Sequence, residues 1–475
     1  MSLTTLSIYS CNGASASANL SIMSSTTRMS PDFISMPNEI IARICEYVAA
    51  HDHAKPISNL RLTCKAFYAP ATKELAQKFL SEPHVMMTRY SLEALVEICK
   101  HPLFGPHVRG ITFDSCRLSL TLFDDLNSRL ETSFTDEDLV AMTQARKEMN
   151  IYLEFLEQEK SLQQTGEASK LVREAFNLLR QYGNAVKMAL TTEDIGCHDI
   201  YPIGYHKAVN QFTWFTEDVL RYLMDAKDIS STFLLMLEAS DASGCEISSL
   251  MIAAFDFDHY DTSPDLSNVR IAHQALTALT ETRLYLDRAP LQNGLDKILE
   301  ATLPFANTLQ KVFLEIGQDA GGGSSLSILA SVARVLGSIN SDELVRLELS
   351  LTSLRKADLL KVLDQHKKTL KQVILEEVAL AGSWVQLISW IRNNLSLDKL
   401  VINGVSELDE QDLTELGDGR PTLLVRGGFD IRGPAKMQPA LDKFLAQKRK
   451  ESAGDEDHGL EEYKWRGSGH VRVIE

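Results

Sequence analysis

Apolar residues recur at helical spacing near the start of the chain. Three isoleucines, Ile40, Ile41 and Ile44, fall on one side of a helix. Pro37 suits the first helical position, where its missing N–H carries no penalty, and Glu39 lies in the first turn, where the helix dipole favours an acidic side chain. The pattern predicts an amphipathic helix that begins at Pro37.

A second apolar set follows after a polar connection. It contains Ile57, Leu60, Leu62, Phe67 and Tyr68, and residues 70–80 continue as a helix that Pro83 ends. Apolar helix faces are more often buried in the core of their own domain than exposed to a partner. The spacing alone therefore favours an ordinary helical hairpin.

The residues themselves resemble a known motif. The run from Met36 to Ile44, with Pro37, Glu39, Ile40 and Ile41, and the run Leu60-Arg61-Leu62-Thr63-Cys64-Lys65-Ala66-Phe67-Tyr68 are together similar to an F-box. The motif covers roughly a tenth of the chain. Met36 stands where the family usually has leucine, and Phe67 where tryptophan is common.

The resemblance implies a fold, a partner and a set of contact residues. An F-box is a three-helix segment that docks on the Skp-family linker protein, and through it on a cullin, in a ubiquitin ligase. The residues that match the docking positions of the family are Pro37, Glu39, Ile40, Ile44, Leu60, Leu62 and Phe67.

A strand-like pattern recurs along the second half of the chain. Its form is an apolar residue, two others, an apolar residue, one other and an apolar residue, as in Leu344, Leu347 and Leu349. Further copies begin at residues 247, 279, 309, 370 and 397, with helical patterns between them. A strand and a helix in each unit resemble an irregular leucine-rich repeat, as in many fungal F-box proteins. A non-repetitive α/β domain is the alternative.

The predicted fold class is thus mixed α/β and helix-rich, with a three-helix F-box followed by an irregular leucine-rich-repeat solenoid. The predicted parts are a disordered leader at 1–34, the F-box at 35–80, a helical connector at 81–105, the repeats at 106–416 with a helical insertion at about 118–245, and a flexible tail at 417–475. The insertion is predicted from helical spacing over 135–157 and 168–190. Met29 and Met36 are both candidate start sites.

Composition narrows the classes of partner. The formal net charge of −16 disfavours nucleic acid and anionic membranes as main partners. The seven cysteines show no Cys-x-x-Cys spacing, which fits a reducing compartment, either cytoplasm or nucleus. No run of 18 or more apolar residues predicts a membrane span.

No pattern of catalytic or metal-binding residues stands out. Residues 256–261 lack the glycine and distal glutamate of a calcium loop, His51 and His53 lack further ligands at supporting spacing, and the glycines at 321–323 lack the Lys-Ser/Thr of a phosphate-binding loop. We therefore expect no catalytic residue, no metal and no cofactor.

Three functions compete at this point. The first is a substrate adaptor of a cullin-type ubiquitin ligase that binds the linker protein and an unknown target protein. The second is an interaction scaffold whose N-terminal helices only cap the repeats, because the end of a repeat array has to be covered. The third is an α/β enzyme, which requires a pocket of convergent polar groups that the sequence does not indicate.

Overall fold

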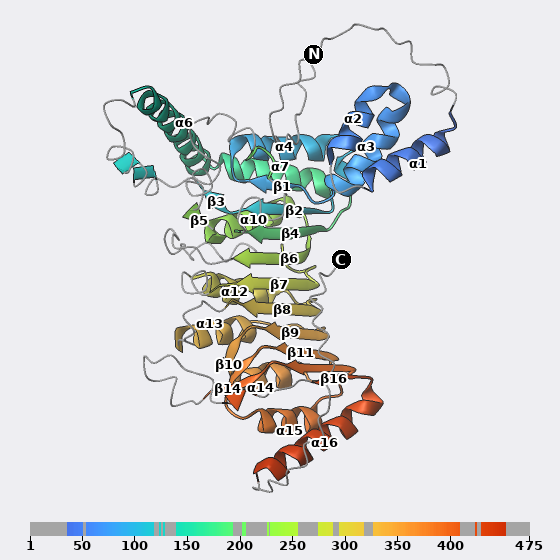
Figure 1. Ribbon diagram of the computed structural model, residues 1–475, viewed down its shortest axis with the longest axis vertical. Coiled ribbons are helices and arrows are strands. Elements are labelled where there is room, and N and C mark those ends of the chain that lie inside the picture. The colour runs from blue at the N-terminus through green and yellow to red at the C-terminus, as the bar shows by residue number, and fades with distance from the viewer. Residues whose placement is uncertain are drawn as a thin grey trace. The chain divides into compact units, whose positions relative to one another are not determined.

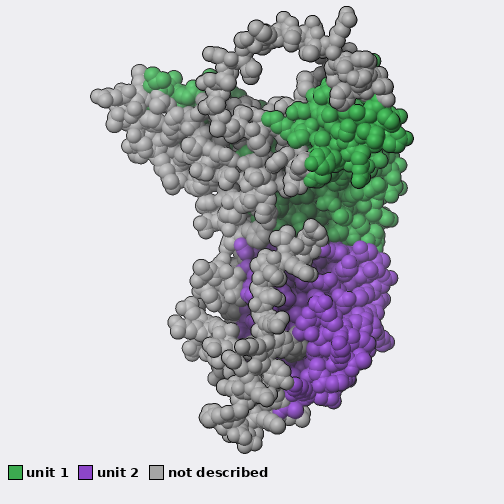
Figure 2. Space-filling view, turned by 45° about the vertical axis from the view of Figure 1, so that its right-hand side comes forward, with its two compact units in different colours: residues 1–279 green, residues 280–475 purple. Residues whose placement is uncertain are grey.

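The computed structural model describes much of the chain between residues 36 and 452. The described residues are 36–50, 54–117, 123–124, 127–128, 139–192, 202–205, 226–227, 229–254, 274–287, 294–317, 326–408, 423–424 and 429–452. The chain divides into two compact units, residues 1–279 and residues 280–475, which Figure 2 colours green and purple.

The first unit contains eight helical elements whose bounds the structure describes. Its helices are α1 (Asn38–Ala49), α2 (Ala54–Thr63), α3 (Lys65–Phe79), α4 (Arg89–Lys100), the short 3-10 helix η2 (Gly105–His107), α6 (Leu139–Gln164), α7 (Glu167–Gln181) and α10 (Ile229–Ser243). Helices α1, α2 and α3 pack on one another, and α7 packs against both α4 and α10 (Figure 1). The apolar face of α7, with Val172, Phe176 and Leu179, is fully buried.

The strands of the first unit form a parallel sheet. In spatial order they are β1 (His84–Met86), β2 (Gly110–Asp114), β4 (Val186–Thr191) and β6 (Ile247–Ala254). The short strands β3 (Cys116–Arg117) and β5 (Ala226–Lys227) pair separately and antiparallel. Parallel neighbours need long crossover connections, and helices fill several of these here.

Strand β4 corrects the predicted helix over 168–190. Helix α7 ends at Gln181, and Gly183 adopts a positive φ of 71°, a left-handed conformation that commonly ends helices. The chain then alternates, with Val186, Met188 and Leu190 buried on one side of the strand. An apolar residue at 186 fits a helical spacing and a strand spacing equally well, so the sequence pattern alone did not separate them.

The second unit contains a larger sheet and a second, smaller one. Its helices are α12 (Asp296–Thr302), the 3-10 helix η6 (Leu303–Phe305), α13 (Leu326–Gly337), α14 (Lys356–Gln365), α15 (Trp384–Asn394) and α16 (Pro434–Ser452). The larger sheet has, in spatial order, β7 (Glu281–Leu286), β8 (Lys311–Ile316), β9 (Arg346–Ser350), β11 (Gln372–Glu376), β13 (Lys399–Asn403) and β16 (Phe429–Arg432). All of these pairs are parallel except β13 with β16.

Three of the four strands in the smaller sheet each follow a strand of the larger sheet directly in the sequence. Its strands are β10 (Ser353–Arg355), β12 (Ala379–Ala381), β14 (Ser406–Leu408) and β15 (Leu423–Leu424), in that spatial order. Leu329 of α13 joins Ala379, Ala381 and Leu408 in a buried apolar cluster against these strands. Trp384, almost fully buried, donates its indole N–H to the carbonyl oxygen of Ser406 at 2.8 Å.

A repeated corner turns the chain from the larger sheet into the smaller one. Leu351, Glu377 and Gly404 follow β9, β11 and β13, and all have positive φ, of 50°, 54° and 62°. The Leu351 amide donates to the carbonyl oxygen of Glu376 at 3.0 Å, and the Glu377 amide donates to that of Asn403 at 2.7 Å. Side chains other than glycine rarely adopt this conformation, so the neighbouring corners must hold it in place.

The predicted solenoid is wrong as a fold class. Strand β4 lies inside the supposed helical insertion at 118–245 yet pairs on both sides within the first unit's sheet, so that stretch is not an insertion. Strand β1 lies in the supposed helical connector. The chain instead builds mainly parallel sheets with helices between successive strands, an α/β arrangement, and the second unit adds a second sheet. The recurring apolar pattern of the sequence located strands, but it did not indicate which sheet each strand joins.

Two further expectations are resolved in part. The tail predicted to be flexible from residue 417 contains strand β16 and helix α16, and α16 packs against α15. The predicted leader at 1–34 lies outside the described residues. Within the described ranges, no helix is both long and apolar enough to cross a membrane.

The corners generate a prediction for Gly404. A Cβ atom there would lie 3.0 Å from Cγ of Glu377, and the φ of 62° disfavours any side chain. We expect Gly404→Ala to lower the free energy of unfolding by about 1 to 2 kcal/mol. Urea unfolding followed by circular dichroism measures this.

The matched control is Gly337→Ala, at the end of α13. No atom lies within 4 Å of the added Cβ there, and its φ is not positive. That substitution should leave stability unchanged or raise it slightly, because alanine favours helices. Equal losses in the two variants would contradict the strained corner.

Candidate functional site

The predicted docking residues lie on α1, α2 and α3, and Pro37 sets the start of the first helix. It is the N-cap of α1, so the helix begins at Asn38, one residue after the predicted start, and the carbonyl oxygen of Pro37 accepts hydrogen bonds from the amides of Ile40 at 3.0 Å and Ile41 at 3.2 Å. Ile41 and Cys45 then face the interior of the three-helix segment. Ile40, next to Ile41, consequently points outward.

The structure separates the predicted docking residues into three groups. Four are exposed: Pro37, Glu39, Ile40 and Leu62. Two are half-buried, Ile44 and Leu60, and Phe67 is buried. The exposed fractions of Ile40 and Leu62, 49% and 66%, are large for aliphatic side chains. Phe67 therefore holds the helices together, whereas Ile40 and Leu62 are available to a partner.

Two exposed aromatic side chains were not among the predicted docking residues. Tyr47 on α1 is 72% exposed and Tyr68 on α3 is 45% exposed. Ile40 and Tyr47 are seven residues apart, which places them on the same side of the helix two turns apart. We call Ile40, Tyr47, Leu62 and Tyr68 the outward apolar residues. The seven-residue spacing from Ile40 was the available sequence signal for Tyr47.

Arg61 connects this segment to the loop after α4. Its guanidinium carbon lies 6.0 Å from the centre of the Tyr68 ring and 5.8 Å from that of Phe104. His101 stacks on Phe104 with ring centres 4.1 Å apart. Burial, followed by the charge of Arg61, lowers the pKa of His101, so this imidazole is neutral near pH 7. Arginine thus bridges two aromatic rings at one end of α2.

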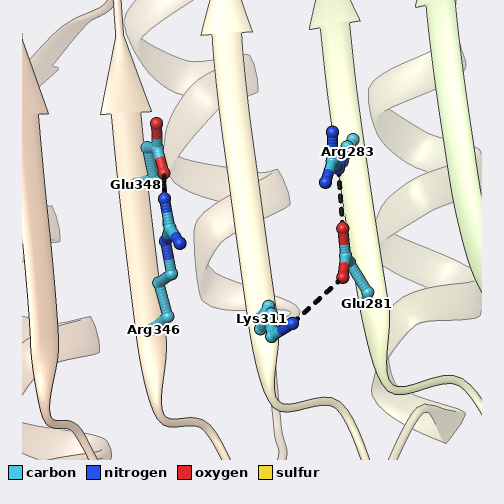
Figure 3. Close-up of polar contacts among 5 residues, drawn as sticks. All are labelled: Glu281, Arg283, Lys311, Arg346 and Glu348. Carbon is cyan, nitrogen blue, oxygen red and sulfur yellow. Dashed lines mark hydrogen bonds and ion pairs between the residues drawn. The ribbon is translucent and has the colours of Figure 1, made fainter. Parts of the chain in front are cut away.

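A second candidate site is the open face of the larger sheet in the second unit. Strands β7 to β13 pair in register, so alternate side chains form rows across neighbouring strands. The alternating residues on the other face, such as Val312, Leu314, Leu347 and Leu349, are buried. Figure 3 shows charged side chains standing in front of the strands, with the helices behind them.

The side chains on this face form three rows, and each row crosses the strands from one strand to the next. The rows follow one another along the direction of the strands. The basic row contains, in order of pairing, Glu281, Lys311, Arg346, Gln372, Lys399 and Arg432. The central row contains Arg283, Phe313, Glu348, Ile374, Val401 and Asp430. The acidic row contains Tyr285, Glu315, Ser350, Glu376 and Asn403. Positive charge therefore dominates at the start of the strands and negative charge at their ends.

Ion pairs fix the side chains of the basic and central rows. Glu281 accepts from Nε of Arg283 at 2.6 Å and from Nζ of Lys311 at 3.4 Å (Figure 3). Nε of Arg346 donates to Oε2 of Glu348 at 3.1 Å (Figure 3). Burial alone would raise the pKa of Glu281, but the hydrogen bonds and charges of Arg283 and Lys311 outweigh it and lower that pKa. These pairs hold the charges in place.

The acidic row has the opposite electrostatic environment. Burial, then the charges of Glu377, Asp287 and Glu348, raises the pKa of Glu315. Burial and the charge of Glu348 likewise raise the pKa of Glu376, against a smaller opposing effect of Lys399. Like charges that lie close together disfavour ionisation of each. The row therefore carries negative charge that the folded protein only partly compensates.

Nothing among the described residues forms an evident catalytic constellation. Burial raises the pKa values of Cys45, Cys99 and Cys245 to about 11, about 12 and about 11, so these thiols are protonated and poorly nucleophilic near pH 7. Across the described part of the chain, no group of three or more His, Cys, Asp or Glu side chains fits a metal ion. The loops at 51–53, 256–261 and 321–325 lie outside the described residues.

Comparisons with known proteins assign no family. No family model matches the chain, and no curated protein matches it. Among solved structures, the chain is similar to a crystal structure of D-psicose 3-epimerase in the presence of D-fructose, at 8% identity over 78% of this chain and 97% of the other. The TM-score is 0.18, too low to support an argument about fold or reaction.

The acidic row predicts a pH dependence of stability. Because the folded-state pKa values of Glu315 and Glu376 lie above their unfolded values, the folded state binds more protons, and these two groups reduce stability as pH rises through the glutamate range and above. We expect Glu315→Gln with Glu376→Gln to raise the melting temperature at pH 7.5 and to have little effect at pH 4. Thermal unfolding at both pH values measures this.

The control is Glu343→Gln with Glu300→Gln. Both glutamates lie in the second unit outside the three rows, and both are exposed. This pair should change the melting temperature similarly little at the two pH values. If the melting temperatures of the wild type and the acidic-row variant differ by the same amount at pH 4 and pH 7.5, the pKa values of Glu315 and Glu376 are not raised in the folded protein.

Proposed function

We propose that the protein is a substrate-recognition adaptor of a cullin-type ubiquitin ligase. In this proposal, helices α1 to α3 bind the Skp-family linker protein, and through it a cullin, while the second unit binds a target protein. The observation that carries the proposal is the exposure of Ile40 and Leu62, two aliphatic residues at positions that the sequence resemblance assigns to docking. We expect the adaptor to act in the cytoplasm or the nucleus.

Energetics support these helices as a docking surface. Fully burying an aliphatic side chain contributes ~1.5 to 3 kcal/mol, and a change of about 1.4 kcal/mol alters a dissociation constant tenfold. Ile40, Leu62 and the added aromatic residues Tyr47 and Tyr68 supply several such groups. Burying all four would contribute more binding free energy than burying one exposed leucine, and single exposed leucines are common on protein surfaces.

A second candidate function is an interaction scaffold in which these helices only cover the protein behind them. Two observations favour it: Phe67 is buried, and Arg61 packs between Tyr68 and the ring of Phe104, which lies outside the three helices. In that case the outward apolar residues would not bind a linker protein. Both proposals share the expectation that the protein is not an enzyme, which stays a prediction.

Substitution of two exposed residues tests the adaptor proposal. We expect Ile40→Asp with Leu62→Asp to weaken binding to purified linker protein at least 100-fold, because two buried apolar contacts would be lost and two charges desolvated. Wild-type protein should bind the linker protein measurably in isothermal titration calorimetry. Because both side chains are exposed, the melting temperature should remain within about 3 °C of the wild type.

Val140→Asp with Val345→Asp is the matched control. Both valines are exposed, at 85% and 38%, and both lie away from α1 to α3 in the sequence. This control should bind the linker protein as the wild type does. If folded wild-type protein does not bind the linker protein, the adaptor proposal is wrong. If Ile40→Asp with Leu62→Asp mainly lowers stability, the covering role is the better account.

A further inference from the structure

The open face of the second unit's larger sheet separates charge by sign along the strands. The basic row holds Lys311, Arg346, Lys399 and Arg432 against one carboxylate, Glu281. The acidic row, four residues further along each strand, holds Glu315 and Glu376, with Asp287 and Glu377 close enough to raise the pKa of Glu315. A partner on this face meets opposite charges on its two sides.

The central row supplies the contact between those two sides. Phe313 and Val401 are half-buried and supply the apolar contact, whereas Ile374, in the same row on β11, is only 4% exposed. Tyr285 of the acidic row lies against Phe313, with ring centres 4.8 Å apart. The face thus has an apolar strip between a positive and a negative margin. It fits an amphipathic element whose negative side lies over the positive margin and whose positive side lies over the negative one.

The dimensions identify the shape of that element. Four residues of a strand span about 13 Å, which separates the basic row from the acidic row. A helix with its side chains is about 10 to 12 Å across, so one helix that crosses the strands fills the distance. Six strands from β7 to β16 span about 24 Å, the length of about 16 helical residues.

We propose that this face binds an amphipathic helix of a target protein that carries acidic residues along one side and basic residues along the other. The acidic side would lie over Lys311 and Arg346, the basic side over Glu315 and Glu376, and an apolar edge over Phe313 and Val401. The proposal rests on the adaptor function, since it names the chemistry of the target. Charge complementarity also fixes which way round the helix binds.

Internal ion pairs do not remove this separation. Arg346 pairs with Glu348 and Arg283 with Glu281, so the central and basic rows are partly neutralised. Lys311 and Arg432 are also paired, with Glu281 at 3.4 Å and with Asp430 at 2.7 Å, but their side chains stay 55% and 73% exposed. The pKa values of both acidic-row glutamates are raised by burial first and by negative neighbours second, so positive charge placed over that margin would favour their ionised forms.

A peptide selection tests the inference on the full-length protein. A displayed library of 20-residue helical peptides, randomised at all outward positions, is selected against immobilised wild-type protein. We expect the enriched sequences to place Asp and Glu on one side of the helix, Lys and Arg on the opposite side, and Leu, Ile or Phe between them. Enrichment without that segregation, or no enrichment, would overturn the inference.

The best enriched peptide is then titrated by fluorescence anisotropy against two charge-reversed variants. Lys311→Glu with Arg346→Glu should bind at least tenfold more weakly than wild type. Lys361→Glu with Lys368→Glu, which changes the net charge equally at exposed positions on α14 and just after it, should bind within twofold of wild type. Equal binding by both variants would place the peptide elsewhere.

Further variants and measurements distinguish the possible outcomes. Lys311→Gln with Arg346→Gln, which avoids new repulsion beside Glu281, should show an intermediate loss, and circular dichroism checks that each variant is folded. Sedimentation equilibrium tests the other occupant: a wild-type dimer that Lys311→Glu with Arg346→Glu dissociates would assign the face to a second copy of this chain and overturn the inference. Linker binding, measured on the same preparations, depends on α1 to α3, so the two proposals fail separately.

Discussion

The in-register parallel pairing of strands β7 to β13 is the constraint on which the second unit depends. Each strand pairs residue for residue with its neighbours, so that Gln372 lies between Arg346 and Lys399. Alternation then sends every second side chain to the helices and the others to the open face. Leucine and valine can fill the core only in this register, because a shift of one residue would exchange the two faces. The charged rows are a direct consequence of the same register.

The corners after β9, β11 and β13 place the strands that follow them side by side in the smaller sheet. Leu351 and Glu377 accept left-handed backbone conformations because each amide donates to the next corner or strand. A cost of about 1 kcal/mol at each residue is offset by the additional strand pairs of β10, β12 and β14. The chain thus gains a second layer, with Trp384 fixed to Ser406, without breaking the pairing of the first.

Local sequence patterns predicted elements better than they predicted architecture. Alternating leucines located β9, and helical spacing located α1 and α6, because these signals depend only on neighbouring residues. The sheet to which a strand belongs depends on contacts between distant residues, so the pairing of β4 inside the supposed insertion was not visible. Likewise, the docking residues were chosen by resemblance, whereas the division between exposed Ile40 and buried Phe67 required the packing of three helices.

The open face also links recognition to stability. Burial of Glu315 and Glu376, and then the charges of their acidic neighbours, oppose folding near neutral pH, as the raised pKa values of both groups indicate. A cationic surface placed over this margin would lower those pKa values and favour the folded state by the same free energy by which the carboxylates favour the partner. Replacing the glutamates would therefore stabilise the free protein and weaken the complex together. A surface selected for folding alone would not retain such a row, whereas a surface selected for binding has reason to keep it.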